Sequence, residues 1–255
     1  MNTKPNYQTW IRMNKLLIFL CLSLLLLLGT LFPIPVYLRV LSGVLSLPFL
    51  YIAFILSYSI YQFSAFGGNY QSRIHDLIVS KVDGGAEKIL DIGTGSGSLI
   101  IKLAKHFPSS TLTGIDYWGE NWEYSKVQCE QNAEIEGVSN RIHFLKASAS
   151  KLPFQDAAFD VVVSCLTFHE VKDSTDKTAV IKEALRCLKP GGDFVFMDLF
   201  QDEKTFGDVN ELIASLMKDG VSDIESYTLA EYIPMPSILL NKKVLGHGMI
   251  ISGRK

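Results

Sequence analysis

Two long uncharged segments near the N-terminus constrain the fold of this chain more than any other feature. Residues 16–32 contain no charged side chain, and after Arg39 a second uncharged run covers residues 40–63. A helix over the first run would be roughly 25 Å long at about 1.5 Å per residue, close to the thickness of the hydrocarbon core of a bilayer. The two runs therefore predict two transmembrane helices, joined by a short turn around Pro33 and Pro35.

Two other interpretations of these runs stay open, namely a cleaved signal peptide for the first run or buried core helices for both. A signal peptide usually has a shorter apolar region and a small-residue cleavage site, whereas this sequence continues into PIPVYL. Lys4, Arg12 and Lys15 precede the first run without any acidic residue, which favours a cytoplasmic N-terminus. We therefore expect a multi-pass membrane protein in which residues 1–68 form an anchoring hairpin and residues 69–255 form a cytoplasmic catalytic domain.

The two parts of the chain differ in charge. Residues 1–68 hold four of the 24 basic residues and none of the 26 acidic ones, which leaves a formal charge of −6 on the rest. Because non-specific affinity for DNA or RNA depends on Lys and Arg, we discount nucleic acid as a substrate. The four cysteines form no CxxC pair and no zinc-type spacing with histidine, so no metal site is predicted and free thiols are expected.

From Lys88 onward, short runs rich in β-branched residues alternate with stretches of helical pattern. This alternation is typical of a parallel sheet covered by helices on both faces, so the predicted class is α/β. The run Lys189-Pro190-Gly191-Gly192 is expected as a turn before the fifth strand. The expected strands are residues 88–91, 111–116, 142–146, 159–164, 193–198 and 249–253, and the expected helices are residues 96–106, 118–136, 175–188 and 208–218.

The stretch LDIGTGSGSL, residues 90–99, places a glycine loop between the first strand and the helix that follows it. A dinucleotide-binding loop has the spacing GxGxxG and seats a pyrophosphate on the amides of a helix. Here the spacing is GxGxG, Ser98 stands where the third dinucleotide glycine belongs, and Asp91 ends the strand. A carboxylate beside a pyrophosphate adds repulsion, so a cationic ligand suits this loop better.

S-adenosylmethionine is a cationic ligand without phosphate, and it carries a sulfonium, an ammonium and a ribose diol. Asp91 would hold the ammonium by a charge-assisted hydrogen bond, while the glycines let the backbone come close to the ligand. Asp116, at the end of the second strand, is placed to accept from the ribose hydroxyls, and Tyr117 to lie against the ribose or adenine. The loop residues assigned to cofactor binding are Gly93, Thr94, Gly95 and Gly97.

With TGIDYW, KASASKLPF, FDVVVSCLTFHEV and LRCLKPGG, the glycine loop resembles the motifs of class I S-adenosylmethionine-dependent methyltransferases, in the branch of ubiquinone/menaquinone-type and small-molecule methylases. The resemblance covers roughly residues 74–234. It implies a Rossmann-like seven-stranded sheet whose last strand is antiparallel, with the cofactor across the carboxyl ends of the strands. In that family an acid after the third strand contacts the adenine amine. The matching run here is Ala147-Ser148-Ala149, so Ser148 and Ala149 are implied as uncharged adenine contacts.

Methyl transfer from a sulfonium is an in-line displacement, so the enzyme mainly orients the acceptor and excludes water. If the acceptor must lose a proton, a base is needed, and the candidates lie just past the strand ends: Thr167 and His169 after the fourth strand and Asp198 after the fifth. His169 has the pKa range best suited to proton removal. Structural roles stay open for His169 and Asp198, with His169 capping the next helix and Asp198 holding a loop. Cys165 is expected either to contact the cofactor through its backbone or to be a small buried hydrophobic residue.

The anchor favours an acceptor that itself resides in the bilayer, because tethering raises the effective concentration of the enzyme toward such a molecule. We expect a methyltransferase with S-adenosylmethionine as cofactor and the membrane lipid bilayer as partner. Its acceptor would be an amphiphilic small molecule such as a phospholipid, a quinol or an isoprenoid. Two alternatives remain. One is a tethered module that binds cofactor without catalysis, and the other is a nicotinamide-dependent oxidoreductase, against which Asp91 and Ser98 argue.

Overall fold

The chain divides into two compact units in a computed structural model that describes residues 4–119 and 124–255. The smaller unit is Gln8–Ser72, and the larger unit combines the N-terminal residues up to Tyr7 with Arg73–Lys255. The division differs in two ways from the expected domains, residues 1–68 and 69–255. It falls after Ser72, and the N-terminal residues group with the larger unit because they hydrogen-bond to its side chains.

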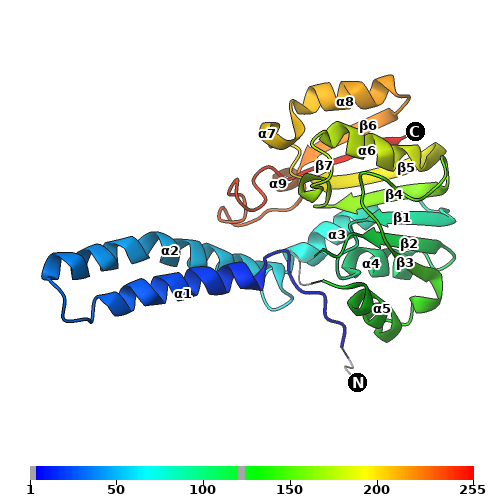
Figure 1. Cartoon of the computed structure of the whole chain (residues 1–255). Helices are drawn as coiled ribbons and strands as arrows, with labels where there is room; N and C mark the ends of the chain where they lie inside the picture. Colours follow the sequence, from blue (N-terminus) through cyan, green and yellow to red (C-terminus); the bar gives the residue numbers. More distant parts are fainter. Residues whose placement is uncertain (1–3, 120–123) are drawn as a thin grey trace. The chain divides into compact units, whose positions relative to one another are not determined.

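The smaller unit is a pair of helices, α1 (Met13–Gly29) and α2 (Val36–Phe63), joined by a short turn (Figure 1). Side chains near the turn tie the helices together, because Ser42 Oγ donates to Leu26 O (2.5 Å) and Arg39 Nε donates to Thr30 O (2.7 Å). Within the described residues, α2 is the one helix long and apolar enough to cross a membrane, and α1 is a shorter apolar helix. One candidate span is therefore present, and two spans stay a prediction.

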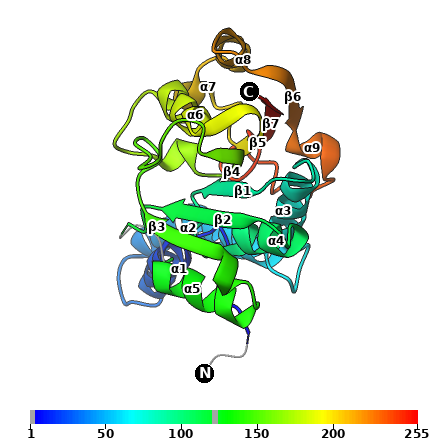
Figure 2. The ribbon, with the colours of Figure 1, turned by 90° about the vertical axis from the view of Figure 1, so that its right-hand side faces the viewer.

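The larger unit is built on a seven-stranded sheet in the order β3-β2-β1-β4-β5-β7-β6. The five strands from β3 to β5 are parallel to their neighbours, while β7 is antiparallel to both β5 and β6 (Figures 1 and 2). The chain leaves β1 toward β2 on one side and returns to β4 on the other, so the carboxyl ends of β1 and β4 form a topological switch point, where ligands bind in open α/β sheets. The strands are β1 (Lys88–Ile92), β2 (Thr111–Asp116), β3 (Ile142–Lys146), β4 (Phe159–Cys165), β5 (Leu188–Asp198), β6 (Ser222–Thr228) and β7 (Met249–Arg254).

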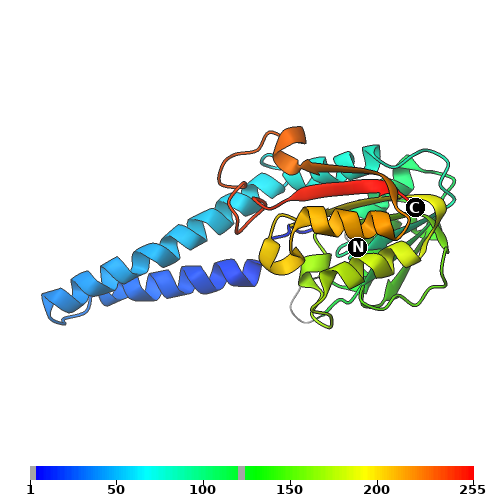
Figure 3. The ribbon, with the colours of Figure 1, turned by 90° about the horizontal axis from the view of Figure 1, so that it is seen from above.

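Helices cover both faces of the sheet. Figures 2 and 3 show α3 and α4 on one face and α6 and α8 on the other. The central strands are buried almost throughout, as the run Val161-Val162-Val163 in β4 illustrates, which explains why their sequences are continuous apolar runs. The helices of this unit are α3 (Tyr70–Ser80), α4 (Ser98–His106), α5 (Lys126–Ile135), α6 (Lys177–Arg186), α7 (Glu203–Phe206), α8 (Val209–Lys218) and α9 (Leu229–Tyr232), with 3₁₀ turns η1 (Ser139–Arg141) and η2 (Phe168–Glu170).

The helix expected over residues 118–136 is wrong at its start. Trp118 has φ +41°, outside the helical region, and the helix begins only at Lys126, where Ser125 caps it by accepting from Gln128 N–H (3.2 Å). Residues 120–123 of the expected helix lie outside the described residues.

The turn expected at residues 189–192 is also wrong, because these residues are the first part of β5. Gly191 takes φ +77°, which a glycine adopts readily, and its N–H donates to Lys255 O. Lys255 N–H in turn donates to Gly192 O (3.0 Å). The other expected strands are confirmed to within a residue or two, and β6 and α3 were not anticipated from the pattern.

Candidate active site

The glycine loop lies at the switch point, directly after β1 and before α4. Its three glycines all have left-handed backbones, with φ of +78° at Gly93, +56° at Gly95 and +83° at Gly97. The loop folds over the end of β2, because Gly93 N–H and Thr94 N–H both donate to Ile115 O, at 2.8 and 2.9 Å. Because the backbone takes a positive φ at every second residue of the loop, glycine recurs at these three positions.

Asp91, in β1, presents a buried carboxylate to this loop. It is 1% exposed, and neither of its oxygens has a hydrogen bond of ordinary geometry among the described residues. The Thr94 hydroxyl and the Ile100 N–H lie near enough only to lower its pKa against the effect of burial. The hydroxyl of Thr94, in the loop itself, is likewise buried without a partner there. Burial raises the pKa of Asp91 to about 7, and the neighbouring carboxylate of Asp116 adds to the shift. Orphaned buried acceptors of this kind fit the ammonium of S-adenosylmethionine, which would satisfy them with donors and a positive charge.

Asp116, at the end of β2, is already bound to the glycine loop. One of its oxygens accepts from Gly95 N–H (2.9 Å) and the other from Trp118 N–H (2.7 Å). Burial raises the pKa of its carboxyl, although these hydrogen bonds act in the opposite direction. Tyr117 is largely exposed, with Lys146 Nζ 5.4 Å from the centre of its ring. The structure therefore places both predicted residues at the edge of the sheet, with Asp116 also shaping the loop.

Ser148 and Ala149 follow β3, and Ala147 N–H ties this segment to Asp116 O (3.0 Å). Ala149 is buried, whereas Ser148 Oγ lies 3.0 Å from Ser150 Oγ. Ser150 Oγ donates to Asp173 Oδ2 (2.7 Å), so a carboxylate from a distant loop stands near the position where the family pattern has an acid. Hydrogen bonds from Ser150 and Ser148 lower the pKa of Asp173. No sequence pattern marks Asp173 as a neighbour of Ser148, because it lies 25 residues away along the chain.

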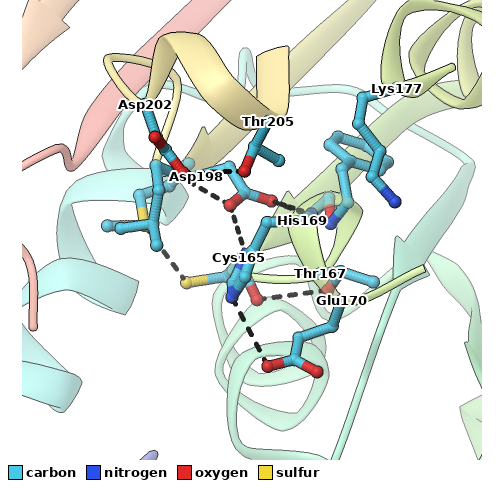
Figure 4. A network of polar contacts seen from close by, with 12 residues as sticks. Cys165, Thr167, His169, Glu170, Lys177, Asp198, Asp202 and Thr205 are labelled. Carbon is cyan, nitrogen blue, oxygen red and sulfur yellow. Dashed lines mark hydrogen bonds and ion pairs between the residues drawn. The ribbon is translucent and has the colours of Figure 1, made fainter. Parts of the chain in front are cut away.

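His169 and Asp198 form a directly hydrogen-bonded pair, with His169 Nδ1 2.6 Å from Asp198 Oδ1 (Figure 4). Asp198 is fully buried, and its oxygens also accept from Phe168 N–H (2.8 Å) and Leu199 N–H (2.7 Å). Burial acts to lower the pKa of His169, but the charge of Asp198 and the hydrogen bond to it outweigh burial, so the pKa is raised above its ordinary value. A histidine oriented by a buried carboxylate is the arrangement of a general base.

A contact between two loops brings the pair to the glycine loop. Thr167, just before η2, donates from Oγ1 to Ile92 O (3.0 Å), and a Cβ added at Gly93 would lie 1.8 Å from that Oγ1. Leu166, with φ +54°, makes the sharp turn out of β4 that delivers Thr167 to this place. Cys165, at the end of β4, has Sγ 3.9 Å from Met197 Sδ, and burial raises the pKa of its thiol well above the usual range. The glycine loop, where the methyl donor is expected, and the His169–Asp198 pair, where the methyl acceptor is expected, are thus adjacent.

Several residues that hold the loop were missed from the sequence. Gly95 O accepts from Trp118 Nε1–H and from the thiol of Cys129, each at 2.9 Å, and Ser96 O accepts from Asn132 Nδ2–H at the same distance. Asn132 and Cys129 lie on α5, so this helix supports the loop with polar side chains. No spacing in the sequence marks these residues, because their partners are backbone carbonyls.

Residues 90–196 match a protein-family model described as a methyltransferase domain. The matched residues form a methyltransferase domain. The chain is 34% identical over 112 residues to the ubiquinone/menaquinone biosynthesis C-methyltransferase of Geotalea daltonii, covering 44% of this chain and 45% of that one. It is 32% identical over 160 residues to the sarcosine/dimethylglycine N-methyltransferase of Aphanothece halophytica, covering 61% and 53%. The chain thus spans about half the length of these relatives.

The fold of this methyltransferase domain is also that of geranyl diphosphate C-methyltransferase from Streptomyces coelicolor A3(2), solved with Mg²⁺, geranyl diphosphate and S-adenosyl-L-homocysteine. The TM-score is 0.56 at 13% identity, over 74% of this chain and 79% of that one, and at this identity the likeness concerns the fold alone. The expected Rossmann-like seven-stranded sheet is confirmed. The expected enzyme class and the expected cofactor, S-adenosylmethionine, are confirmed for the domain.

Proposed function

We propose that this protein transfers a methyl group from S-adenosylmethionine to an amphiphilic small molecule in a bilayer, such as a quinol, a phospholipid or an isoprenoid. The observation that carries the proposal is the buried, unpartnered carboxylate of Asp91 beside the glycine loop. A buried carboxylate without partners is costly, and a cationic ligand removes that cost. A pyrophosphate at the same place would increase it.

The cofactor supplies a methyl group that its sulfonium has already activated. Asp91 would hold the ammonium, and the glycine loop would follow the amino-acid portion closely because no side chain intervenes. Asp116 keeps free lone pairs beyond its bonds to Gly95 and Trp118, so it can still accept from the ribose hydroxyls. Ser148 and Ala149, after β3, would border the adenine, with Tyr117 beside the ribose.

The role of the His169–Asp198 pair is to remove a proton from the acceptor. With Nδ1–H donating to Asp198, the lone pair of Nε2 can take the proton. Nε2 lies 3.8 Å from Glu170 Oε1, and the charge of Glu170 also raises the pKa of His169. The electron pair left on the acceptor atom would then be free to take the methyl group, and the pair of the former carbon–sulfur bond would stay with the sulfur of the cofactor. Asp198 stabilises the imidazolium that results and fixes the orientation of the ring, as its buried position and further backbone donors favour.

Membrane anchoring is the second part of the proposal. Within residues 1–68, α1 and α2 would insert as a hairpin of two spans, with the domain from residue 69 in the cytoplasm. The long apolar helix α2 supports one span, and the apolar α1 with its turn near Pro33 supports a return partner. The basic residues Lys4, Arg12 and Lys15 lie before α1, in keeping with a cytoplasmic N-terminus.

The test uses the full chain in phosphatidylcholine vesicles with cofactor carrying a radiolabelled methyl group. Separate samples contain a reduced quinone, phosphatidylethanolamine or an isoprenoid alcohol in the bilayer, and a parallel sample contains sarcosine in the water. We expect label in the lipid phase of at least one sample and none on sarcosine. Label on sarcosine alone would move the acceptor into the water, and cofactor binding without any transfer would favour a non-catalytic binding module.

A further inference from the structure

The N-terminal arm, defined as residues 4–7, lies against α5 in the larger unit and contacts the glycine loop. Both polar groups of the Asn6 backbone are taken up by side chains of α5. Asn6 N–H donates to Asn132 Oδ1 (2.8 Å), while Asn6 O accepts from Asn132 Nδ2 (2.9 Å) and from Gln128 Nε2 (2.5 Å). The side-chain amide of Asn132 thus bonds to both backbone groups of Asn6, donating to one and accepting from the other, as a neighbouring β-strand would.

Asn132 connects the arm to the glycine loop. Its Nδ2 donates to Ser96 O (2.9 Å) as well as to Asn6 O, and the side chain is only 2% exposed. The arm also reaches the loop directly, because Ser96 Oγ donates to Tyr7 O (2.6 Å). Ser96 is 4% exposed and lies between Gly95 and Gly97. The backbone carbonyl of Ser96 is therefore bonded to Asn132, and its hydroxyl is bonded to the arm itself.

The end of the arm is fixed by a further contact. Tyr7 Oη donates to Glu136 Oε1 (2.9 Å), and Glu136 is also paired with Lys105 at the end of α4. Burial raises the pKa of the Tyr7 phenol, which keeps the hydrogen on its oxygen. The arm is thus bonded to α5 and to the residues flanking α4, the two helices that border the loop.

We propose that the N-terminal arm is a positioning element of the cofactor site, which holds the glycine loop in its binding shape through Asn132 and Ser96. This inference rests on the proposed function, since it takes the loop to be the place where S-adenosylmethionine binds. A glycine loop loses more conformational freedom than any other segment when it is ordered, so pre-ordering reduces the cost of binding. The arm precedes α1, so the segment leading into the apolar hairpin also sets the affinity of the domain for its cofactor.

Asn6 bonds to Asn132 through its backbone rather than its side chain, so one variant can remove the contact and a matched variant can keep it. Asn6→Pro removes the N–H that donates to Asn132, whereas Asn6→Ala keeps both backbone groups of residue 6. The full-length wild type and both variants are titrated with S-adenosylhomocysteine by calorimetry, and cofactor KM and kcat are measured. We expect Asn6→Pro to bind about fivefold to tenfold more weakly, from the loss of a buried hydrogen bond. Its kcat at saturating cofactor should be unchanged, and Asn6→Ala should resemble the wild type.

A double-mutant cycle separates positioning from plain folding. Asn132→Ala removes the link between arm and loop, so adding Asn6→Pro to it should cost little more affinity than Asn132→Ala alone. Thermal transitions measured without ligand should show that Asn6→Pro, although less stable by the lost hydrogen bond, is fully folded at the temperature of the titration. Equal affinities of Asn6→Pro and wild type would overturn the arm inference while leaving the proposed function intact. A wild type that does not bind S-adenosylhomocysteine at all would overturn both.

Discussion

His169 is the residue on which the proposed chemistry turns, because Asp198 both orients its ring and raises its pKa. A general base works only when it is deprotonated, so activity should be lost as pH falls through the pKa of His169 in the folded protein, which lies above the ordinary 6.5. We expect His169→Gln to lower kcat by about 10²- to 10⁴-fold and to abolish this limb of the pH profile. Steady-state rates between pH 5.5 and 9 measure both effects.

The control for this variant is His143→Gln, at an exposed position of β3. It should leave the rate and the pH profile unchanged. A pH profile that persists in His169→Gln would place the titrating base elsewhere, and His169 would then be a structural residue of η2.

Because of Asp91, the stability of the ligand-free protein should fall as pH rises, which is opposite to the contribution of a carboxylate whose pKa is lowered by folding. Its pKa is raised from 3.8 to about 7 in the folded state, so the folded state binds the extra proton and stability falls as pH rises through this window. We expect Asp91→Asn to match the wild type in thermal stability only below the unfolded-state pKa of 3.8, at about pH 3. Near pH 8 the variant should be more stable by about 1–4 kcal/mol, since the wild type then buries a charge.

The matched control is Asp160→Asn, because Lys189 Nζ lies 2.5 Å from Asp160 and lowers the pKa of that carboxyl against the effect of burial. Asp160→Asn removes the negative charge that pairs with Lys189, so this variant should be less stable than the wild type at pH 8. Asp91→Asn should also bind S-adenosylhomocysteine at least tenfold more weakly, as expected for the loss of a charge-assisted bond. A variant that keeps full affinity would show that the ammonium binds elsewhere.

At the scale of elements, the glycine loop and the loop after β4 can approach each other only because residue 93 is a glycine. Gly93 has φ +78°, and its Cβ would lie 1.8 Å from Thr167 Oγ1. Gly93→Ala should therefore push the segment 166–169 away from the glycine loop and reduce both cofactor affinity and kcat. Gly137→Ala is the control, because Gly137 has φ +72° but no atom within 4 Å of an added Cβ.

The comparison isolates the steric contact from backbone strain. Gly137→Ala should cost about 1 kcal/mol of stability with no loss of activity. The double variant Gly93→Ala with Thr167→Gly should recover part of the lost activity, because it removes the atoms that clash. Equal effects of Gly93→Ala and Gly137→Ala would mean that the loops are not in contact.

The sequence predicted the strands that contain a run of apolar or β-branched residues. The strands β1, β2 and β4 are Ile- and Val-rich and lie at the centre of the sheet, so their apolar runs identify them. The strand β6, with the sequence SDIESYT, was missed because none of its side chains is fully buried, whereas the other edge strand, β3, buries Ile142 and Phe144. The start of β5 was taken for a turn because Lys-Pro-Gly-Gly has turn composition, whereas its partner is the distant Lys255.

The candidate site shows the same limit. Asp91, Asp116, His169 and Asp198 each follow or end a strand, and parallel strands bring such residues to one edge, so their proximity was predictable. Asp173 and Asn132 reach the site from a loop and a helix, through contacts that depend on tertiary packing. No local pattern in the chain encodes those contacts.

At the scale of the whole molecule, the apolar hairpin is expected to decide where the protein resides. In α2, Leu47 and Phe54 are 59% and 58% exposed, and in the larger unit Val127 and Met217 have the same exposures, 59% and 58%. We expect the pair Leu47→Arg and Phe54→Arg to abolish stable membrane insertion, since each charge costs about 2.5–3.5 kcal/mol at the centre of a span. Flotation of vesicles on a density gradient measures the bound fraction.

The control pair, Val127→Arg and Met217→Arg, introduces the same charge at equally exposed positions outside the hairpin. It should float with the vesicles as the wild type does. Flotation of the α2 variant would show that α2 is not a span, and loss of flotation in both would point to misfolding, which the thermal transition of each variant reports.

The order of strands at one edge of the sheet has a consequence for biosynthesis. Among the described strands, β6 pairs with β7 alone, and β7 is inserted between β5 and β6 although it is made later than either. During translation β6 therefore has no strand to pair with until residues 249–254 have left the ribosome. A nascent chain stalled before that point would keep an open sheet edge at β5, where a chaperone or another unfinished chain could dock.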